Sequence, residues 1–309
     1  MRDIKPRREC ISFLHPRYWA SWAGLGALRA ISLLPLPVLW LLGAVFGQLA
    51  TCLPGRARRT VDTNLALCFP DMGKVQRRRL RNQHFRAVAQ VLLSLGISLW
   101  ASQRRLARLI RFRQREYYDR AVTEGKRVIL LAPHFLVLEI AGLYLSHERP
   151  MMSMYKSPKN ELFDWVLRHS RTRFGGVMIE RSAELRPLIR LLREGRPFYY
   201  LPDQEPGDAD FVFAPFFSIP AATITALSRM ARLTDAVVIP CFTRLLPYGT
   251  GYEVTFGAPL ANYPSGDNVL DATQMNAVIE SGMRERPDQY MWSYKRFKTR
   301  PDNLPSFYL

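Results

Sequence analysis

The sequence predicts an α/β fold with a largely parallel central sheet flanked by helices, preceded by an N-terminal membrane-anchor helix. Three observations lead to this prediction. From residue 126 onward, short apolar runs alternate with helical segments, a pattern typical of layered α/β folds. One uncharged stretch near the N-terminus is long enough to reach across a hydrocarbon layer. The segment between that stretch and residue 120 is strongly basic and has helical spacing of its apolar residues.

Length and composition set the domain organisation. A chain of 309 residues allows two domains, or one large α/β domain with an appendage. With 48% hydrophobic and 12% aromatic residues it has enough apolar material for a core, which excludes wholesale disorder. We therefore expect a membrane-anchor segment over 1–56 and an α/β domain over 57–309, the latter beginning with a basic helical region at 57–120.

The uncharged stretch lies between Arg29 and Arg56, and its apolar core is Ile31–Leu53. Pro35 and Pro37 suit a first helical turn, so the uninterrupted helix is expected to begin near Pro37 and to be only ~24 Å long. That length is short for a hydrocarbon layer of ~30 Å. A single spanning anchor, a half-embedded monotopic helix and a buried helix of a soluble core remain open as interpretations. Basic residues lie on both flanks of the stretch, so the positive-inside rule alone gives no orientation. Because the sequence shows no second span and Lys/Arg-rich sequence follows, we expect the rest of the chain to lie in the cytoplasm.

The formal net charge of +18 is concentrated in the N-terminal third, where residues 1–120 hold 22 basic and 6 acidic side chains. Such a region implies an anionic partner: a nucleic acid, an acidic protein or an anionic membrane surface. Its aromatic residues do not form a stacking platform and no nucleic-acid module is recognisable, so we expect no nucleic-acid partner. Beside an anchor, the 12 Arg and Lys of residues 74–115 are expected to rest on anionic headgroups, the alternative being a solvated charged face.

Helices and strands are predicted from periodicity. In the basic region, one helix face is formed by Phe85, Val88, Val91, Leu92 and Leu95, and Arg104–Arg115 is a second basic amphipathic segment. The expected strands are Val128–Ala132, Met151–Tyr155, Pro197–Leu201, Ala236–Phe242 and Tyr252–Phe256. The expected helices between them are Leu136–Leu145, Leu162–Phe174, Leu185–Arg193 and Ala222–Leu233.

Several familiar catalytic motifs are missing from the sequence. There is no G-x-S-x-G, no Walker loop, no H-E-x-x-H and no G-x-G-x-x-G after a strand, which weighs against serine hydrolases, nucleotide-driven transferases, zinc peptidases and Rossmann oxidoreductases. The four cysteines include no C-x-x-C pair, so the sequence indicates neither a zinc site nor a disulfide framework.

His134 is the strongest catalytic candidate that remains. A predicted strand runs into Pro133 and His134, and a helix that carries Glu139 follows; ligands of open α/β sheets bind at such carboxyl ends of strands. An imidazole can accept a proton from a substrate hydroxyl while a carboxylate on its other nitrogen fixes the tautomer. Since residues five apart on one helix lie ~140° apart, His134 must precede the helix to meet Glu139. A His–Glu pair without a protein nucleophile suits direct attack of a hydroxyl on an activated acyl group, the alternative being a structural histidine.

Several sequence blocks occur in the order typical of one family. They are Asn64-Leu65-Ala66-Leu67-Cys68-Phe69-Pro70, His134 to Glu139, Tyr155-Lys156 with Asp164-Trp165, Glu180-Arg181-Ser182, Leu201-Pro202-Asp203-Gln204, Val212 to Phe217, and Gln289 to Trp292 with Arg296 to Pro301. With these blocks the chain resembles the late (secondary) acyltransferases of lipid A biosynthesis, the lauroyl/myristoyl-transferase family related to the lysophospholipid acyltransferases. The resemblance covers nearly the whole chain and implies a glycerolipid-acyltransferase-like fold.

The resemblance implies that His134 is a general base and Glu139 its orienting carboxylate. The residues implied in substrate binding are Arg171, Asp203, Arg181 and Lys156, the last two as contacts to substrate phosphates. Two of them have structural alternatives. Arg171 has Asp164 and Glu161 as partners on its own helix, and Asp203 follows a buried strand, where turn-forming Asp is common.

The implied activity is transfer of a fatty acyl chain from acyl carrier protein to a hydroxyl of a phosphorylated lipid A precursor, forming an acyloxyacyl ester. The implied location is the cytoplasmic side of the inner membrane. The expected partners are acyl carrier protein, the precursor and the anionic membrane surface. No metal or other cofactor is expected, because the thioester of acyl carrier protein already supplies the activation. Two alternatives stay open: an acyltransferase acting on another phosphorylated lipid, such as a lysophospholipid or a phosphoinositide mannoside, and a membrane-tethered basic binding protein.

Overall fold

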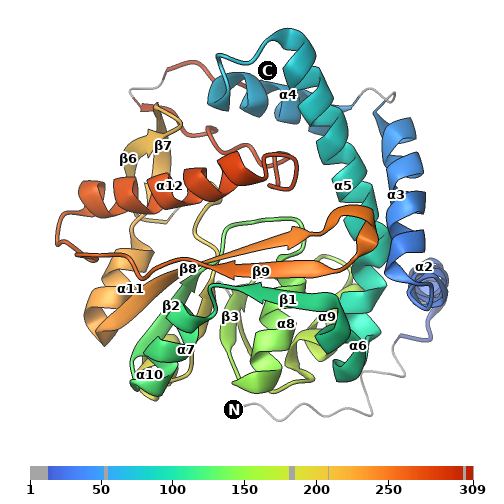
Figure 1. Ribbon diagram of the computed structural model, residues 1–309, viewed down its shortest axis with the longest axis horizontal. Coiled ribbons are helices and arrows are strands. Elements are labelled where there is room, and N and C mark those ends of the chain that lie inside the picture. Colours follow the sequence, from blue (N-terminus) through green and yellow to red (C-terminus); the bar gives the residue numbers. More distant parts are fainter. Residues whose placement is uncertain (1–12, 52–54, 181–184, 208, 302–303, 309) are drawn as a thin grey trace.

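The structure is a computed structural model that describes residues 13–51, 55–180, 185–207, 209–301 and 304–308. A seven-stranded sheet lies at its centre (Figure 1). In sheet order, its strands are β1 (Ile110–Arg113), β9 (Tyr252–Phe256), β8 (Ala236–Leu245), β2 (Arg127–Leu131), β5 (Phe198–Tyr200), β3 (Met152–Tyr155) and β4 (Val177–Glu180). All neighbouring strands are parallel except β8 and β9, which are antiparallel. The predicted α/β class with a largely parallel sheet is therefore confirmed.

Helices form the rest of the fold together with a two-stranded hairpin. The N-terminal elements are η1 (Pro16–Tyr18), α2 (Trp19–Ile31), α3 (Leu36–Ala50), α4 (Arg56–Cys68), α5 (Lys74–Trp100) and α6 (Gln103–Leu109). The remaining helices are α7 (Glu116–Thr123), α8 (Leu138–Glu148), α9 (Glu161–Thr172), α10 (Leu185–Arg193), α11 (Ala226–Thr234), η2 (Pro247–Gly249) and α12 (Asn268–Glu285). The antiparallel hairpin is made of β6 (Phe211–Phe216) and β7 (Ile219–Ile224).

The central strand β2 is buried on both faces, as expected for a parallel strand between helical layers. Its residues Ile129 and Leu131 pack in one hydrophobic cluster, with side chains of α4, α10, α11, α12 and the β6–β7 hairpin. Val128 and Leu130 point the other way, into a cluster with side chains of α3, α6, α7 and α8. The alternation along one strand explains why this segment reads as a continuous apolar run in the sequence.

Two expected helices differ from the structure. The segment Arg104–Arg115 is not one amphipathic helix, because α6 ends at Leu109 and Ile110–Arg113 forms strand β1 beside β9. Apolar and charged residues alternate in Ile-Arg-Phe-Arg, which is the period of a strand. The expected helix Ala222–Leu233 begins only at Ala226, because the preceding residues pair in the β6–β7 hairpin.

The expected N-terminal anchor helix is also not supported as a membrane span. The apolar run Ile31–Leu53 is divided, because α2 ends at Ile31 and α3 begins at Leu36, beside Pro35 and Pro37; the end of the run, at residues 52–53, lies outside the described residues. In the part of the chain that the structure describes, no helix combines the length and apolar composition needed to cross a bilayer. The 15 residues of α3 span only ~22 Å.

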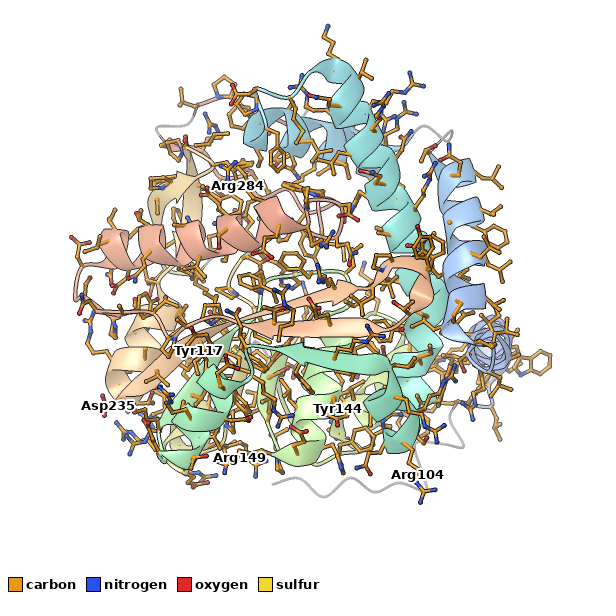
Figure 2. The ribbon with its side chains drawn as sticks, in the orientation of Figure 1. Arg104, Tyr117, Tyr144, Arg149, Asp235 and Arg284 are labelled. Carbon is orange, nitrogen blue, oxygen red and sulfur yellow. The ribbon has the colours of Figure 1, made fainter. Side chains whose placement is uncertain are left out.

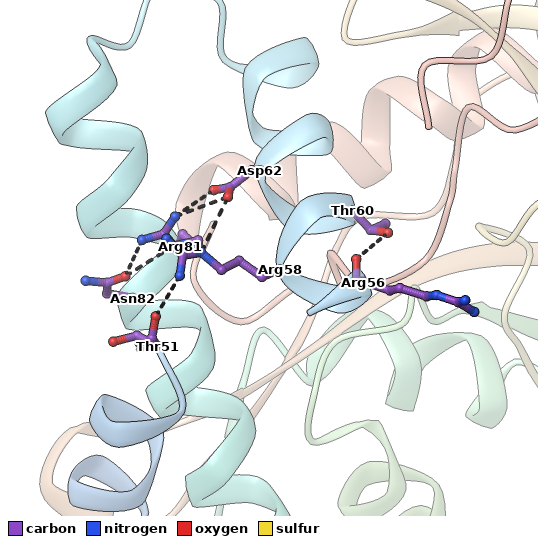
Figure 3. Close-up of polar contacts among 7 residues, drawn as sticks. All are labelled: Thr51, Arg56, Arg58, Thr60, Asp62, Arg81 and Asn82. Atoms are coloured by element: carbon purple, nitrogen blue, oxygen red, sulfur yellow. Dashed lines mark hydrogen bonds and ion pairs between the residues drawn. The ribbon is translucent and has the colours of Figure 1, made fainter. Parts of the chain in front are cut away.

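The long helix α5 connects these N-terminal helices to the rest of the fold, with α3 alongside it at the outer edge of the molecule (Figure 1). Figure 3 shows how α4 is attached: Arg81 of α5 donates two hydrogen bonds of 3.1 Å to the carboxylate of Asp62. Arg58, on α4, lies 3.9 Å from the same carboxylate. The Arg81 side chain is nearly buried and that of Asp62 is about half exposed, so the ion pair joins the two helices at the edge of their contact.

Candidate active site

His134 lies just beyond the carboxyl end of β2, ahead of α8, as the sequence predicted. A strand-like segment near the C-terminus holds the backbone around it. The carbonyl of His134 accepts a hydrogen bond of 3.0 Å from the amide of Met291, and the amide of Leu136 donates to the carbonyl of Gln289 at 2.9 Å. Phe135 and Tyr290 form the bridge between these two segments. The histidine therefore lies on a loop whose backbone is hydrogen-bonded to the segment Gln289 to Met291.

The partner of the His134 imidazole is Asp203, which follows β5, the neighbouring strand. Nδ1 of His134 lies 2.6 Å from Oδ1 of Asp203, and the backbone amide of His134 donates to Oδ2 at 2.7 Å. The Asp203 side chain is fully buried. Burial opposes its ionisation, but the charge and the hydrogen bonds of His134 outweigh that effect and lower the pKa of the Asp203 carboxyl. An ionised carboxylate thus holds Nδ1 as the protonated nitrogen.

The other ring nitrogen of His134, Nε2, lies beside Gln204, and both residues line the cavity. Nε2 lies 3.1 Å from the side-chain amide nitrogen of Gln204, which can donate a hydrogen bond to an unprotonated Nε2. Tyr294 packs edge-on against the imidazole, with ring centroids 5.2 Å apart. Sequence reasoning assigned no role to Gln204 or Tyr294. Gln204 directly follows Asp203, which is the only signal in the sequence that points to it.

Glu139 was expected to orient the imidazole of His134, but its partner in the structure is Arg171. Arg171 of α9 binds it in a two-pronged ion pair, with Nε donating to Oε2 at 3.0 Å and Nη2 donating to Oε1. The structure thus corrects the expected pairing of the imidazole with Glu139, because Asp203 occupies Nδ1. The alternative partners of Arg171 on its own helix, Asp164 and Glu161, form ion pairs with other arginines instead. Burial disfavours the Arg171 cation, but the charge of Glu139 outweighs it and raises the pKa of the guanidinium.

These residues line a cavity of about 650 Å³ at the carboxyl ends of β2, β3 and β5. His134, Glu139, Arg171 and Gln204 contribute to its wall. Lys156, directly after β3, is exposed and also lines it. The rest of the wall is largely apolar, with side chains such as Leu143, Met152, Met154 and Met178. The sequence prediction for Arg181 falls outside the described residues.

The block Asn64 to Pro70 supports the site from α4. The side-chain amide of Asn64 donates hydrogen bonds of 2.7 Å to the carbonyls of both Trp292 and Tyr294. Trp292 is buried and packs against Phe69 and Tyr290, with ring centroids 5.8 Å and 5.2 Å apart. Two blocks more than 220 residues apart in sequence therefore hold the ring of Tyr294 at the imidazole.

Chemically, the arrangement suits proton transfer at the mouth of an apolar cavity. His134 lines the cavity, a buried carboxylate at Nδ1 can stabilise an imidazolium, and the cationic side chains of Lys156 and Arg171 lie at the wall. The apolar volume is of the size that accommodates a long aliphatic chain.

Comparison with known proteins shows the family to which the chain belongs. Residues 8–299 match the family model described as bacterial lipid A biosynthesis acyltransferase. The chain is 34% identical to the lipid A biosynthesis lauroyltransferase of Escherichia coli K12 over 298 residues, which covers 96% of this chain and 97% of that protein. It is 32% identical to the palmitoleoyltransferase of the same organism, again covering 96% and 97% of the two chains. It is 35% identical to a lipid A biosynthesis acyltransferase of Haemophilus influenzae, covering 94% and 91%. The chain belongs to the bacterial lipid A biosynthesis acyltransferase family.

Proposed function

We propose that this protein transfers a fatty acyl chain from acyl carrier protein to a hydroxyl on an acyl chain of a phosphorylated lipid A precursor, forming an acyloxyacyl ester. The observation that carries the proposal is the geometry of His134. Its Nδ1 is held by the buried carboxylate of Asp203 and its Nε2 faces the apolar cavity, so the imidazole is set up as a base for a hydroxyl brought there.

In the proposed reaction, Nε2 of His134 removes the proton of the acceptor hydroxyl as its oxygen attacks the thioester carbonyl. The carboxylate of Asp203 stabilises the resulting imidazolium through Nδ1. When the tetrahedral intermediate collapses, the carbon–sulfur bond breaks and the departing thiolate takes the proton from the imidazolium. The products are the new ester and the free thiol of the carrier, and His134 returns to its neutral form. The thioester supplies the activation, so the reaction as written needs no metal and no nucleotide.

We assign Glu139 a role different from direct contact with the imidazole. Its ion pair holds Arg171 at the wall of the cavity, where the guanidinium can donate to a polar group of the substrate. Lys156 lies exposed at the same cavity and supplies an ammonium for a phosphate of the acceptor.

The charge distribution supports the proposed partners and location. Acyl carrier proteins are acidic and the precursor is phosphorylated, so the basic N-terminal third attracts both of them as well as anionic lipid. We place the protein at the cytoplasmic side of the inner membrane, where a thioester donor in solution and a lipid acceptor in the bilayer meet.

The test is direct. Purified protein in detergent is incubated with a panel of acyl carrier protein thioesters and with tetra-acyl or penta-acyl precursors, and the lipid products are analysed by mass spectrometry. We expect the mass of one acyl chain to be added to a lipid A precursor, with a fragment that identifies an acyloxyacyl ester. Acylation of a lysophospholipid or phosphoinositide mannoside with none of the lipid A precursor contradicts the proposed acceptor. Absence of acyl transfer to every lipid contradicts the proposed reaction.

A further inference from the structure

Arg296 is a buried cation to which the proposed reaction gives no role. The residue is only 3% exposed, and its guanidinium carbon lies 5.0 Å from the ring centroid of Phe216. The described residues that line the cavity do not include Arg296, so we expect no direct contact with a substrate bound there. Taking a cation out of water is costly unless the protein compensates its charge. The buried guanidinium therefore needs a partner inside the protein.

The hydrogen bonds of Arg296 go to uncharged acceptors. Nη1 donates to the carbonyl of Ala222. Nη2 donates to the hydroxyl of Thr223 at 3.0 Å and to the side-chain oxygen of Asn276 at 3.5 Å. In the part of the chain that the structure describes, Nε has no acceptor and no carboxylate lies within ion-pair distance of the guanidinium. These contacts hold the side chain in place but do not compensate its charge.

The segment that carries Arg296 also holds the imidazole of the site. The amide of Met291 donates to the carbonyl of His134 at 3.0 Å, and the ring of Tyr294 packs edge-on against the imidazole. The amide of Arg296 donates to the carbonyl of Tyr294 at 3.0 Å, which makes a tight turn between the two residues. The buried cation is therefore fixed close behind the His134–Asp203 pair.

The negative charge that acts on Arg296 is that of Asp203. The other titratable groups that act on it are Tyr290, Tyr308 and Cys68. Burial raises the pKa of the Cys68 thiol and of the Tyr290 hydroxyl, and it raises the pKa of Tyr308 to about 12, so these three groups are neutral near neutral pH. Burial also lowers the pKa of Arg296 from 12.5, but a guanidinium stays charged in proteins.

Asp203 needs a cation when the site is ready to react. The proposed base is an unprotonated imidazole, so His134 then gives Asp203 hydrogen bonds but no positive charge. Tyr290 and Tyr294, which also act on Asp203, are neutral because burial raises their pKa. A fully buried carboxylate without a compensating cation takes up a proton. The guanidinium of Arg296 supplies that positive charge from inside the core.

We propose that Arg296 is a positioning residue whose buried charge keeps Asp203 ionised, so that His134 stays a neutral base at neutral pH. The inference rests on the proposed function, because it gives Arg296 a part in preparing that base. Arg296 acts through Asp203 and does not contact the reacting atoms. Its hydrogen bonds also join the β6–β7 hairpin to α12 (Figure 1), so the experiments must separate its charge from this structural contact.

The first experiment measures the pH dependence of kcat/KM for acyl transfer from acyl carrier protein to a lipid A precursor. Arg296→Gln removes the charge and Arg296→Lys keeps it. Loss of a nearby positive charge favours protonation of the His134–Asp203 pair, so we expect the acid limb of the Arg296→Gln profile to move up by ~1 pH unit. Arg296→Lys should restore most of the unaltered profile.

Two matched controls separate charge from structure. Thr223→Val removes a hydrogen-bond acceptor of Arg296 and leaves the charge in place. Arg284→Gln removes a charge from α12 at a side chain that is 59% exposed and is labelled in Figure 2. We expect both controls to keep the unaltered acid limb. An unshifted limb in Arg296→Gln, or an equal shift in Thr223→Val, overturns the proposal. Absence of acyl transfer by the unaltered protein contradicts the proposed function instead, and the second experiment then decides.

The second experiment measures stability and needs no activity. The urea midpoint of unfolding is determined for the unaltered protein, Arg296→Gln, Asp203→Asn and the double variant. Because each charge compensates the other, we expect the midpoint shift caused by Arg296→Gln to be at least ~2-fold smaller in the Asp203→Asn background. If Arg296→Gln alone does not fold, a folded double variant is the same result. Equal shifts in the two backgrounds, or a double variant that does not fold, overturn the proposal.

Discussion

The proposed reaction depends on a single histidine, His134, whose two ring nitrogens have different partners. Nδ1 is bound by a carboxylate that has no contact with solvent, whereas Nε2 faces the cavity. A buried ionised carboxylate is stable only with such a partner, so the pair is mutually dependent. Sequence reasoning predicted His134, Asp203, Glu139 and Arg171 as site residues, and its expected pairing of His134 with Glu139 is wrong, because Asp203 binds Nδ1 and Arg171 binds Glu139. The pairing depends on which strands are neighbours, and β2 and β5 are 66 residues apart in the chain.

Replacing Asp203 by Asn preserves the shape of the side chain and removes its charge. We expect kcat for acyl transfer to fall by about 10²–10⁴-fold while the protein remains folded. The pKa of the Asp203 carboxyl is lowered in the folded state, so its ionisation stabilises the fold above its ordinary pKa of 3.8 and this stabilisation is lost as the pH falls below that value. Urea unfolding should therefore show a stability difference between the two proteins that is constant near neutral pH and shrinks below about pH 4. A difference that grows in acid contradicts an ionised Asp203.

The ion pair between Glu139 and Arg171 predicts strong coupling between two residues 32 positions apart in the sequence. Both side chains are about one-quarter exposed, so removing one leaves a poorly hydrated charge. We expect Glu139→Gln and Arg171→Gln each to reduce stability, and the double variant to be less destabilised than the sum, with a coupling free energy of about 1–3 kcal/mol. A double-mutant cycle by urea denaturation measures it. Additive effects of the two substitutions would show that the pair contributes no net interaction.

Among the elements, several strands and helices with clear apolar patterns were predicted, including the short strand β5, whereas β1, β4, the β6–β7 hairpin and the 18-residue helix α12 were not. Strand β9 has the predicted bounds, and α10 does as well. Strand β1 was not predicted, because its four residues follow a basic helical segment and were interpreted as part of it. Their strand conformation depends on pairing with β9, which is far away in the sequence. Likewise, the hairpin β6–β7 contains Pro215 and Pro220, which weaken a strand prediction, and it is stabilised by pairing and by packing on α12.

The helix α5 carries a buried histidine with a testable pH effect. His84 is almost entirely buried, and burial lowers the pKa of its imidazole from 6.5 to about 4, against the smaller effect of its hydrogen bond with the carbonyl of Asp288. The unfolded chain therefore binds a proton that the folded chain excludes, so stability is full above pH 6.5 and falls as the pH is lowered towards 4.

We expect this residue to account for a loss of about 3 kcal/mol between pH 6.5 and 4. The measurement is urea unfolding over that range, comparing the protein with His84→Gln and with His147→Gln, which alters an exposed histidine. The His84 variant should show a flatter pH dependence and the His147 variant the original one. Parallel curves for all three proteins would mean that His84 titrates alike in the folded and unfolded states.

At the scale of the whole molecule, the excess of basic charge and much of the exposed apolar surface belong to the N-terminal helices, whereas the cavity is lined by residues between His134 and Tyr294. The charge asymmetry and the apolar run were visible in the sequence, and both indicated a membrane surface. The sequence predicted that the helix in this run begins near Pro37, and α3 begins at Leu36. It did not reveal that Gly43 and Gly47 let α3 pack closely on α5, because that contact depends on tertiary packing. These glycines contribute little to a hydropathy profile, but they let α3 pack against α5 and so make α3 part of the folded domain.

The central claim is that His134 acts as the base that activates the acceptor hydroxyl. The measurement that tests it most directly is steady-state kinetics of acyl transfer from acyl carrier protein to a lipid A precursor by the unaltered protein and by His134→Gln. We predict that kcat falls by about 10²–10⁴-fold, with KM for the acyl donor little changed and the vesicle binding of the protein retained. Turnover by His134→Gln within a few-fold of the unaltered protein would contradict the account.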